Sequence, residues 1–280
     1  IPMIGGVRAG QLLSRFGDPQ GVYEAGTAGW REILSDSVVE YMDRQKKSGN
    51  LEEEYHSLGE KQIGLVFQEE EGFPQKLLEI PDPPYGLFYK GKLPEQKQPS
   101  VAVIGARECS EYGRFVAEEL GRYLGSQGIQ VISGMARGID GISQQAALLA
   151  GGTSCGVLGC GVDICYPRQN RKLYEELIQK GGLLSTYAPG TKALPAYFPP
   201  RNRIVSGLAD ALIVIEARQK SGTLITVDMA LEQGKDVYVV PGRITDRLSD
   251  GCNRLLTQGA GVFLSPESFT EEFLRNWEEK

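Results

Sequence analysis

The chain has 280 residues, more than the usual domain of roughly 100 to 150 residues, and we expect two unequal domains. It contains no apolar run close to the roughly 20 residues of a membrane span, and its first residues lack the profile of a secretory signal. We therefore expect a cytoplasmic protein with no membrane partner. The net charge of −6 is unevenly distributed: residues 1–99 carry −5, residues 100–216 carry +1 and residues 217–280 carry −2. Because the middle of the chain is not acidic, the negative net charge of the whole chain does not exclude a polyanionic partner there.

The cysteines and the single histidine do not form a reactive set. Five cysteines, an odd number, are spread along the chain without a CxxC pair, which argues against a disulfide framework and against a zinc site. His56 lies in a polar helical stretch far from the glycine-rich loops, so a serine or cysteine nucleophile would lack its usual base. We expect reduced thiols, no metal and no catalytic residue.

Residues 1–62 are expected to form a small all-α domain. Segments 4–17, 24–34 and 35–47 each place apolar residues three or four apart, and Gly, Asp-Pro or Ser-Asp separates them. Residues 63–99 contain strand-like runs among loops and are expected to extend the next domain at its N-terminal side. Residues 269–280 are expected to be a C-terminal helical tail.

Residues 63–268 are expected to form one larger domain. From residue 100 onward its sequence repeats the same order: an apolar run, a glycine-rich turn and an amphipathic helix. The runs are SVAVIG, GIQVISG, TSCGVLG, GGLLST, DALIVIEA, DVYVVPG and GVFLS. They are nearly continuous in apolar residues, as strands buried on both faces of a parallel sheet must be. The pattern predicts the α/β class, with a Rossmann-like, doubly wound and mostly parallel sheet.

The glycine-rich loops after these runs are the candidate binding elements, because ligands of open parallel sheets bind beyond the carboxyl ends of the strands. A dinucleotide site needs G-x-G-x-x-G after the first strand and an acidic residue at the end of the second. Here the first loop reads Gly105-Ala106-Arg107, and the second run ends at Ser133-Gly134 without an acid. The P-loop pattern GxxxxGK[ST] does not occur either. We therefore expect no nucleotide cofactor.

Basic residues follow run after run at the predicted edge of the sheet. They are Arg107, Arg137, Arg168, Arg201, Arg203 and Lys220. A guanidinium group binds two phosphate oxygens at once and stays charged, so a row of them suits a chain of phosphates. The alternative is that these side chains pair with internal carboxylates and tie the loops together; the candidates are Glu108, Asp140, Asp163 and Asp210.

Aromatic residues stand next to these cations. Tyr197 and Phe198 precede Arg201, and Tyr166 stands two residues before Arg168. A base stacks on an aromatic face only when it is unpaired, so the pattern favours single strands over duplexes. The alternative is that Phe198 fills the core beneath a helix.

At these motifs the sequence resembles the DNA-processing protein A family (DprA or Smf), bacterial proteins of natural transformation. The resemblance covers about residues 65–265 and rests on FPQKLLEIPDPPYGLFYKG, VAVIGARECSEYG, VISGMARGIDGISQQAAL, GCGVDICYPRQNRKLYEEL, FPPRNRIVSGLADALIVIEA, KSGTLITVDMALEQGKDVYVVPG and GCNRLLTQGA. Residues 1–30 are similar to that family's N-terminal helical domain, which is SAM-like or helix-hairpin-helix-like, with Met3 where glycine is frequent.

The resemblance implies single-stranded DNA binding, protection of incoming DNA and its transfer to the recombinase RecA. It implies a homodimer through the Rossmann-like domain, with the contact expected at about residues 245–265. Many members of the family also carry a C-terminal winged-helix domain, which we do not expect from the residues after 270. Arg107 and Arg168 would be the main phosphate ligands; Pro195 stands where relatives have lysine, and Lys192 is the possible substitute. The implied DNA-binding residues are Gly105, Ala106, Arg107, Ser110, Gly134, Met135, Arg137, Gly138, Arg168, Phe198, Arg201, Asn202, Arg203, Lys220, Ser221, Gly222 and Thr223.

Two other functions stay open at this point. SGTLIT loosely resembles the phosphate-binding turn of nucleotide-phosphoribosyl hydrolases of the same fold, for which Glu216 or Glu232 would be the acid, but their PGGxGT signature is absent. The second alternative is a scaffold that binds only protein and leaves the arginine row idle. We favour DNA binding without catalysis.

Overall fold

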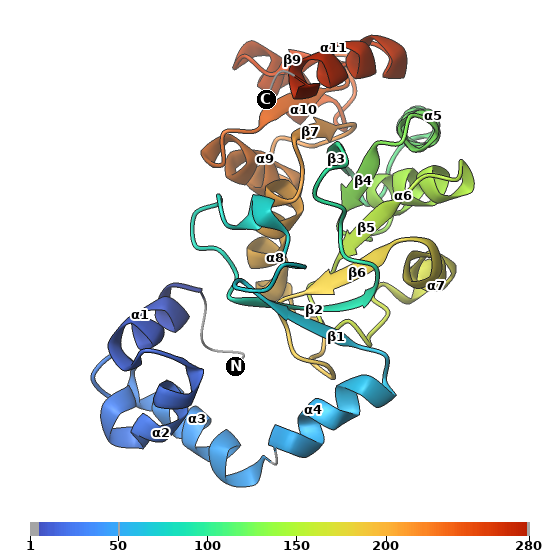
Figure 1. Ribbon diagram of the computed structural model, residues 1–280. Helices are drawn as coiled ribbons and strands as arrows, with labels where there is room; N and C mark the ends of the chain where they lie inside the picture. The colour runs from blue at the N-terminus through green and yellow to red at the C-terminus, as the bar shows by residue number, and fades with distance from the viewer. Residues whose placement is uncertain (1–5, 50, 279–280) are drawn as a thin grey trace.

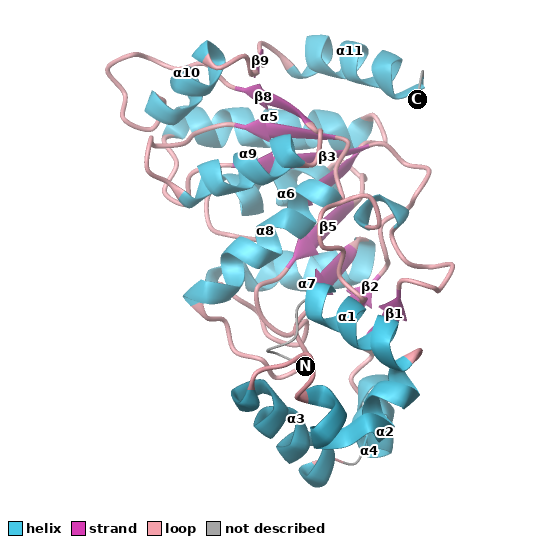
Figure 2. Ribbon diagram, turned by 90° about the vertical axis from the view of Figure 1, so that its left-hand side faces the viewer, coloured by secondary structure: helices cyan, strands magenta, loops and turns pink. Residues whose placement is uncertain are grey.

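The computed structural model describes residues 6–49 and 51–278, and it consists of a small helical bundle beside a larger α/β unit (Figure 1). The bundle and helix α11 lie at opposite ends of the molecule (Figures 1 and 2). Met3 and the other residues of the expected N-terminal turn before Gly6 lie outside the described residues. None of the helices among residues 6–49 and 51–278 is long and apolar enough to cross a membrane.

The larger unit is built on one mixed sheet, which has nine strands within the described residues. They are β1 (Gly64–Phe67), β2 (Gly86–Gly91), β3 (Ser100–Ile104), β4 (Gln130–Ser133), β5 (Ser154–Val157), β6 (Gly182–Ser185), β7 (Ala211–Val214), β8 (Asp236–Val239) and β9 (Gly261–Val262). Their order is β1-β2-β6-β5-β4-β3-β7-β8-β9. The pairs from β6 to β9 are parallel, and β1 and β2 add an antiparallel edge. The Rossmann-like, mostly parallel sheet is thus confirmed.

Helices cover both faces of this sheet, which runs as a central band through the larger unit (Figure 2). One layer contains α5 (Glu111–Ser126), α6 (Ile139–Leu149), α7 (Arg171–Lys180) and α11 (Pro266–Glu278), and the other contains α8 (Phe198–Gly207), α9 (Gly222–Glu232) and α10 (Asp250–Thr257). Alternate residues of β3 face the two layers: Val101 and Val103 pack with α5, and Ala102 and Ile104 pack on the opposite side. Both faces are buried, which explains the continuous apolar runs.

The C-terminal helix belongs to this packing and is not a separate tail. It begins at Pro266, three residues before the expected boundary, and Phe269 and Phe273 are buried in the core against α5. Aromatic side chains spaced four residues apart fall on one helix face, so the helix is fixed to the sheet.

The helical bundle has its own core. This core is formed by residues of α1 (Gly6–Phe16), α2 (Pro19–Trp30) and α3 (Asp36–Ser48) and of the loop between α2 and α3, whereas α4 (Leu51–Glu60) follows them and leads to β1. Trp30 is buried at its centre and donates its indole N–H to the Val22 carbonyl at 2.6 Å. Helix α2 begins earlier than the apolar pattern predicts, because Asp18 accepts a hydrogen bond from Gly21 N and Pro19 suits the first helical position.

Candidate functional site

Three loops meet where the strand order reverses, between β3 and β7. The chain turns at Gly105 after β3, and the Ala106 carbonyl accepts a hydrogen bond from Ile139 N, at the start of α6, at 3.2 Å. On the other side, the Thr223 hydroxyl, in the first turn of α9, donates to the Gly105 carbonyl at 3.4 Å. Because this is the switch point of a doubly wound sheet, it is the position where such folds bind their ligands.

A half-buried aromatic ring lies beside this loop with a cation over it. Phe198 begins α8, and the Arg107 guanidinium carbon lies 5.5 Å from its ring centroid, at cation–π distance. The exposed ring of Tyr166 lies 5.7 Å from the same centroid, tilted by 31°. Arg168 follows Tyr166 after the cis peptide to Pro167 and opens a 3₁₀ turn, Arg168–Asn170. Aromatic faces and cations therefore alternate along the edge between β5 and β3.

Several expected cations are free at this edge. Arg107, Arg168 and Lys220 are exposed and form no ion pair with any residue in 6–49 or 51–278. Arg137 is also exposed and lies 3.8 Å from a carboxylate oxygen of Glu108, a loose surface pair. Near the β6 end, Pro195 begins a 3₁₀ turn and Lys192 is exposed. The free cations thus come from the loops after β3, β5 and β7.

Arg201 departs from the expectation of a free phosphate ligand. Its side chain is 5% exposed, and one guanidinium nitrogen donates to the carbonyls of Gly134, at 2.6 Å, and of Val157. Burial lowers the pKa of this guanidinium, and the nearby buried carboxylate of Asp140 opposes that effect. Arg201 ties the ends of β4 and β5 to α8, so we correct its role from DNA ligand to internal tie.

The neighbours of Arg201 are also engaged internally. The Asn202 side-chain oxygen accepts from Arg201 Nε at 3.1 Å. Arg203 donates to the Pro81 carbonyl at 3.0 Å and pairs with the Asp82 carboxylate at 3.2 Å. Arg203 therefore points to the loop before β2, and the expectation that it offers a free guanidinium group to DNA is corrected, whereas in Asn202 only the side-chain oxygen is engaged.

Three further expected ligands are turned inward. Gly134 and Met135 are buried, and Met135 adopts a φ of 52° while its carbonyl accepts from Asn170 at 3.0 Å. Ser110 caps α5, and both its N–H and its hydroxyl donate to the carboxylate of Glu216. These residues shape the loops through their internal hydrogen bonds.

The remaining expected residues lie at two helix starts. Gly138 precedes α6 with a φ of 71°, and a side chain there would collide with the Ala106 carbonyl. Ser221 and Gly222 begin α9, and the Ser221 hydroxyl oxygen is buried with no hydrogen-bond partner among the described residues. Together with Gly105, Ala106 and Thr223, they bring backbone groups close to the free cations.

Glu216 was considered only as the acid of a hydrolase, and its structural role at the start of α5 was not predicted from the sequence. It follows β7, is 2% exposed, and its two oxygens accept from the backbone and side chain of Ser110. The carboxylate therefore occupies the N-terminus of α5, where a bound phosphate would lie in a nucleotide-binding sheet. Its position at the end of a buried strand is the only sequence signal that could have identified it.

Burial disfavours the reactive thiolate form of three cysteines. Burial raises the pKa of Cys160 to about 11 and that of Cys252 to about 12, and it raises the pKa of Cys155 as well. The side chains of the described residues also contain no group of three or more His, Cys, Asp or Glu that could hold a metal ion.

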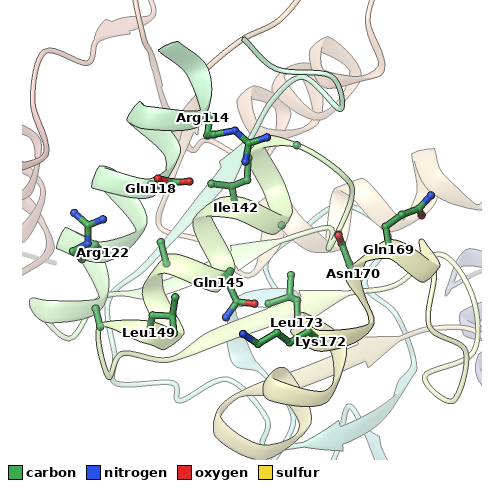
Figure 3. A pocket seen from close by; sticks show the side chains of 14 residues that line it. Arg114, Glu118, Arg122, Ile142, Gln145, Leu149, Gln169, Asn170, Lys172 and Leu173 are labelled. Carbon is green, nitrogen blue, oxygen red and sulfur yellow. The ribbon is translucent and has the colours of Figure 1, made fainter. Parts of the chain in front are cut away.

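A cleft of about 580 Å³ lies on the outer surface between α5, α6 and α7 (Figure 3). Its cations already have partners on their own helices: the pairs are Arg114–Glu111, Arg122–Glu119 and Lys172–Glu176. Glu118 adds a further negative charge to the wall. Because its charges are mixed and paired, this cleft is less suited to a polyanion than the edge of the sheet.

Known proteins share this architecture and its motifs. A family model for DNA recombination-mediator protein A matches residues 64–274. The DNA processing protein DprA of Streptococcus pneumoniae is 40% identical over 228 residues, which cover 79% of this chain and 80% of that protein. The DprA of Bacillus subtilis is 39% identical over 201 residues, covering 71% and 68%.

Solved structures agree with the sequence comparisons. The structure of DprA from Streptococcus pneumoniae has a TM-score of 0.74 at 35% identity and covers 91% of this chain and 82% of its own. DNA processing protein A from Helicobacter pylori, solved to study its single-stranded DNA binding mode, has a TM-score of 0.69 at 30% identity, covering 77% and 97%. The chain therefore belongs to the DNA recombination-mediator protein A family.

Proposed function

We propose that this protein binds single-stranded DNA along the carboxyl edge of the sheet and acts on it without catalysis. The observation that carries the proposal is the group formed by Phe198 and the unpaired cations Arg107, Arg168 and Lys220 around the switch point. Guanidinium and ammonium groups bind phosphates regardless of sequence, and an aromatic ring accepts any unpaired base. The single-stranded DNA binding described for the Helicobacter pylori relative supports the proposal.

Binding of this kind has a recognisable salt dependence. Arg107, Arg137, Arg168 and Lys220 provide four exposed cations for phosphates. For single strands, the logarithm of the binding constant falls by about 0.7 per phosphate contact for each tenfold rise in salt, which gives a slope of roughly 3. A duplex of equal length is expected to bind more weakly, because its paired bases cannot stack on Phe198.

The site is tested by measuring oligo-dT binding by fluorescence anisotropy over a range of salt concentrations. Arg107→Ala and Arg168→Ala should each weaken binding of all sequences alike and lower the salt slope by about 0.7. Arg122→Ala, an exposed arginine of α5 outside the edge, is the matched control and should bind like the wild type. Wild-type affinity and slope in both the Arg107 and the Arg168 variants would refute the site.

The biological role we propose is protection of incoming DNA and loading of RecA onto it during natural transformation, in the cytoplasm. Membership of a recombination-mediator family supports this role. It is tested by following the ATPase activity of RecA on DNA that is already covered by a single-strand-binding protein. The wild type should shorten the lag, and Arg107→Ala should not; an unchanged lag with the wild type would refute RecA loading.

We further propose a homodimer through residues 245–265. Strand β9 lies at the edge of the sheet, and Leu264 just after it is 77% exposed, with Val262 also exposed. An edge strand with apolar neighbours is a surface that a second copy can cover. Light scattering should show a dimer for the wild type and a monomer for Leu264→Glu, with Leu149→Glu, on the exposed face of α6, as the control. A monomeric wild type would refute this proposal.

The hydrolase alternative has less support. Glu216, its candidate acid at the site, is buried and engaged by Ser110, and Glu232 lies exposed at the end of α9. Neither carboxylate faces the space beside Phe198 with a free oxygen and a partner for proton transfer. Release of free base from a nucleoside monophosphate would overturn the non-catalytic proposal.

A further inference from the structure

A second arginine and aromatic ring lie on the same edge of the sheet, beyond the site described above. The loop after β8 and the N-terminus of α5 enclose a cleft of about 660 Å³. Tyr112 and Arg243 line it from opposite sides, and Ser110, Glu111, Pro241, Gly242, Asp246 and Ser249 complete the lining. Tyr112 is 52% exposed, so its ring offers a face to a ligand.

Both walls of this cleft are held in place. The Tyr112 hydroxyl reaches the Pro241 carbonyl at 3.4 Å, which sets the ring across the mouth of the cleft. The Asn253 side chain accepts from Gly242 N at 3.2 Å and donates to the Gly242 carbonyl at 3.0 Å, so the residue before Arg243 is anchored on α10. The cleft therefore exists before any ligand binds.

The charges of the lining leave one cation free. Asp246 accepts a hydrogen bond from Leu248 N at 2.9 Å, and Glu111 points to solvent, with one oxygen 3.9 Å from Arg114. Arg243 is exposed and forms no ion pair with the residues that the structure describes. The carboxylates are thus engaged by the protein or by solvent, while the guanidinium is available for a phosphate.

We propose that the cleft between Tyr112 and Arg243 is a second nucleotide subsite, which takes a base on Tyr112 and its phosphate on Arg243. This inference rests on the proposed single-stranded DNA binding and extends its path past β3 and β7 to β8. The loop after β7 carries two exposed cations, Arg218 and Lys220. In the sheet, β7 lies between β3, on the side of the first subsite, and β8, on the side of the second. One strand then contacts Phe198 first and Tyr112 farther along.

The spacing of the strands sets the length of DNA that reaches both subsites. Four strand intervals separate β5, under Phe198, from β8, which amounts to about 19 Å. The 3.4 Å rise per nucleotide of a stacked, B-form strand gives roughly six nucleotides for this distance, and an extended single strand covers it with fewer. A trinucleotide, with two steps between its outer bases, is too short to reach both subsites, and a dodecanucleotide is long enough.

The test compares labelled dT3 and dT12 with the full chain. Arg243→Ala should lower the salt slope for dT12 by about 0.7, and Tyr112→Leu should raise the Kd for dT12 about tenfold, while neither changes the binding of dT3. Arg107→Ala should weaken both oligonucleotides, and Arg122→Ala neither. Circular dichroism and thermal melting verify that each variant is folded.

The outcomes separate this proposal from the one on which it rests. If dT12 binds to the wild type and is weakened by Arg107→Ala, but its Kd and salt slope are unchanged in the Arg243 and Tyr112 variants, the second subsite is refuted and the first stands. If the wild type binds neither oligonucleotide, both are refuted. Loss of dT3 binding in the Tyr112 and Arg243 variants would also overturn the second subsite as a separate position.

Discussion

Replacing Arg201 with methionine should destabilise the protein strongly, although Arg201 lies only a few residues from Phe198. The substitution removes the donors to the Gly134 and Val157 carbonyls, which are buried at the ends of β4 and β5. It also leaves the buried Asp140 carboxylate without the cation that offsets its burial. Leaving two buried carbonyl groups without their donor costs about 1 to 3 kcal/mol each. At about 2 to 4 °C per kcal/mol, the midpoint of melting should fall by roughly 10 °C.

This destabilisation should depend on pH. Burial raises the pKa of Asp140, and Arg201 acts in the opposite direction, so the pKa rises further when Arg201 is removed. A carboxyl group whose folded pKa lies above its unfolded value, about 3.9, keeps its proton better when folded. The folded state then loses stability as the pH rises from about 4 through that raised pKa. The difference between wild type and Arg201→Met should be larger at pH 7 than at pH 5.

The assay is thermal melting and urea unfolding of wild type, Arg201→Met and Arg107→Ala at both pH values. Arg107 is exposed, so its variant should melt like the wild type and lose DNA affinity alone. An Arg201→Met protein that melts like the wild type but binds DNA poorly would refute the reasoning, because Arg201 would then act as a ligand and not as an internal tie.

Three other substitutions test the packing around the site. Phe198→Leu should raise the Kd for dT12 about tenfold, measured by anisotropy, with little change in melting temperature, since it removes a stacking face and keeps an apolar side chain. Gly134→Ala should lower the melting temperature by several degrees, because its Cβ would lie 2.7 Å from an Arg201 guanidinium nitrogen. Glu216→Gln should lower the free energy of unfolding in urea by about 1 to 3 kcal/mol, since it weakens both hydrogen bonds from Ser110.

Strands β3 to β7 were predictable because each of them is buried on both faces. The runs at 100–105 and 210–217, for example, became β3 and β7, paired in parallel with Val101 opposite Ala211. A strand covered by helices on both sides must be apolar at every position, and a glycine-rich turn must follow it, so local sequence was sufficient. Helix α11 was placed less well, because the burial of Phe269 against α5 depends on packing between distant segments.

The sequence could not show which arginines are exposed to solvent and which are bonded to other parts of the protein. Arg168 and Arg203 both stand near aromatic residues and proline, yet Arg168 is exposed and Arg203 pairs with Asp82, 121 residues earlier in the chain. The partner of Arg201 is a backbone carbonyl of Gly134, which has no sequence signature at all. Whether a loop cation faces solvent is decided by which segments the fold brings beside it.

Glu216 explains how a dinucleotide-type sheet is adapted to a polymeric ligand. The N-terminus of α5 carries the partial positive charge that would hold a pyrophosphate, but the Glu216 carboxylate already occupies it. A Cβ at Gly113 would lie only 2.5 Å from that carboxylate, so there is no room for a second anion below the helix. Anion binding is therefore left to Arg107 and the other exposed side chains. Such side chains contact phosphates from solvent, one by one along an edge, which suits a chain of nucleotides better than a single enclosed cofactor.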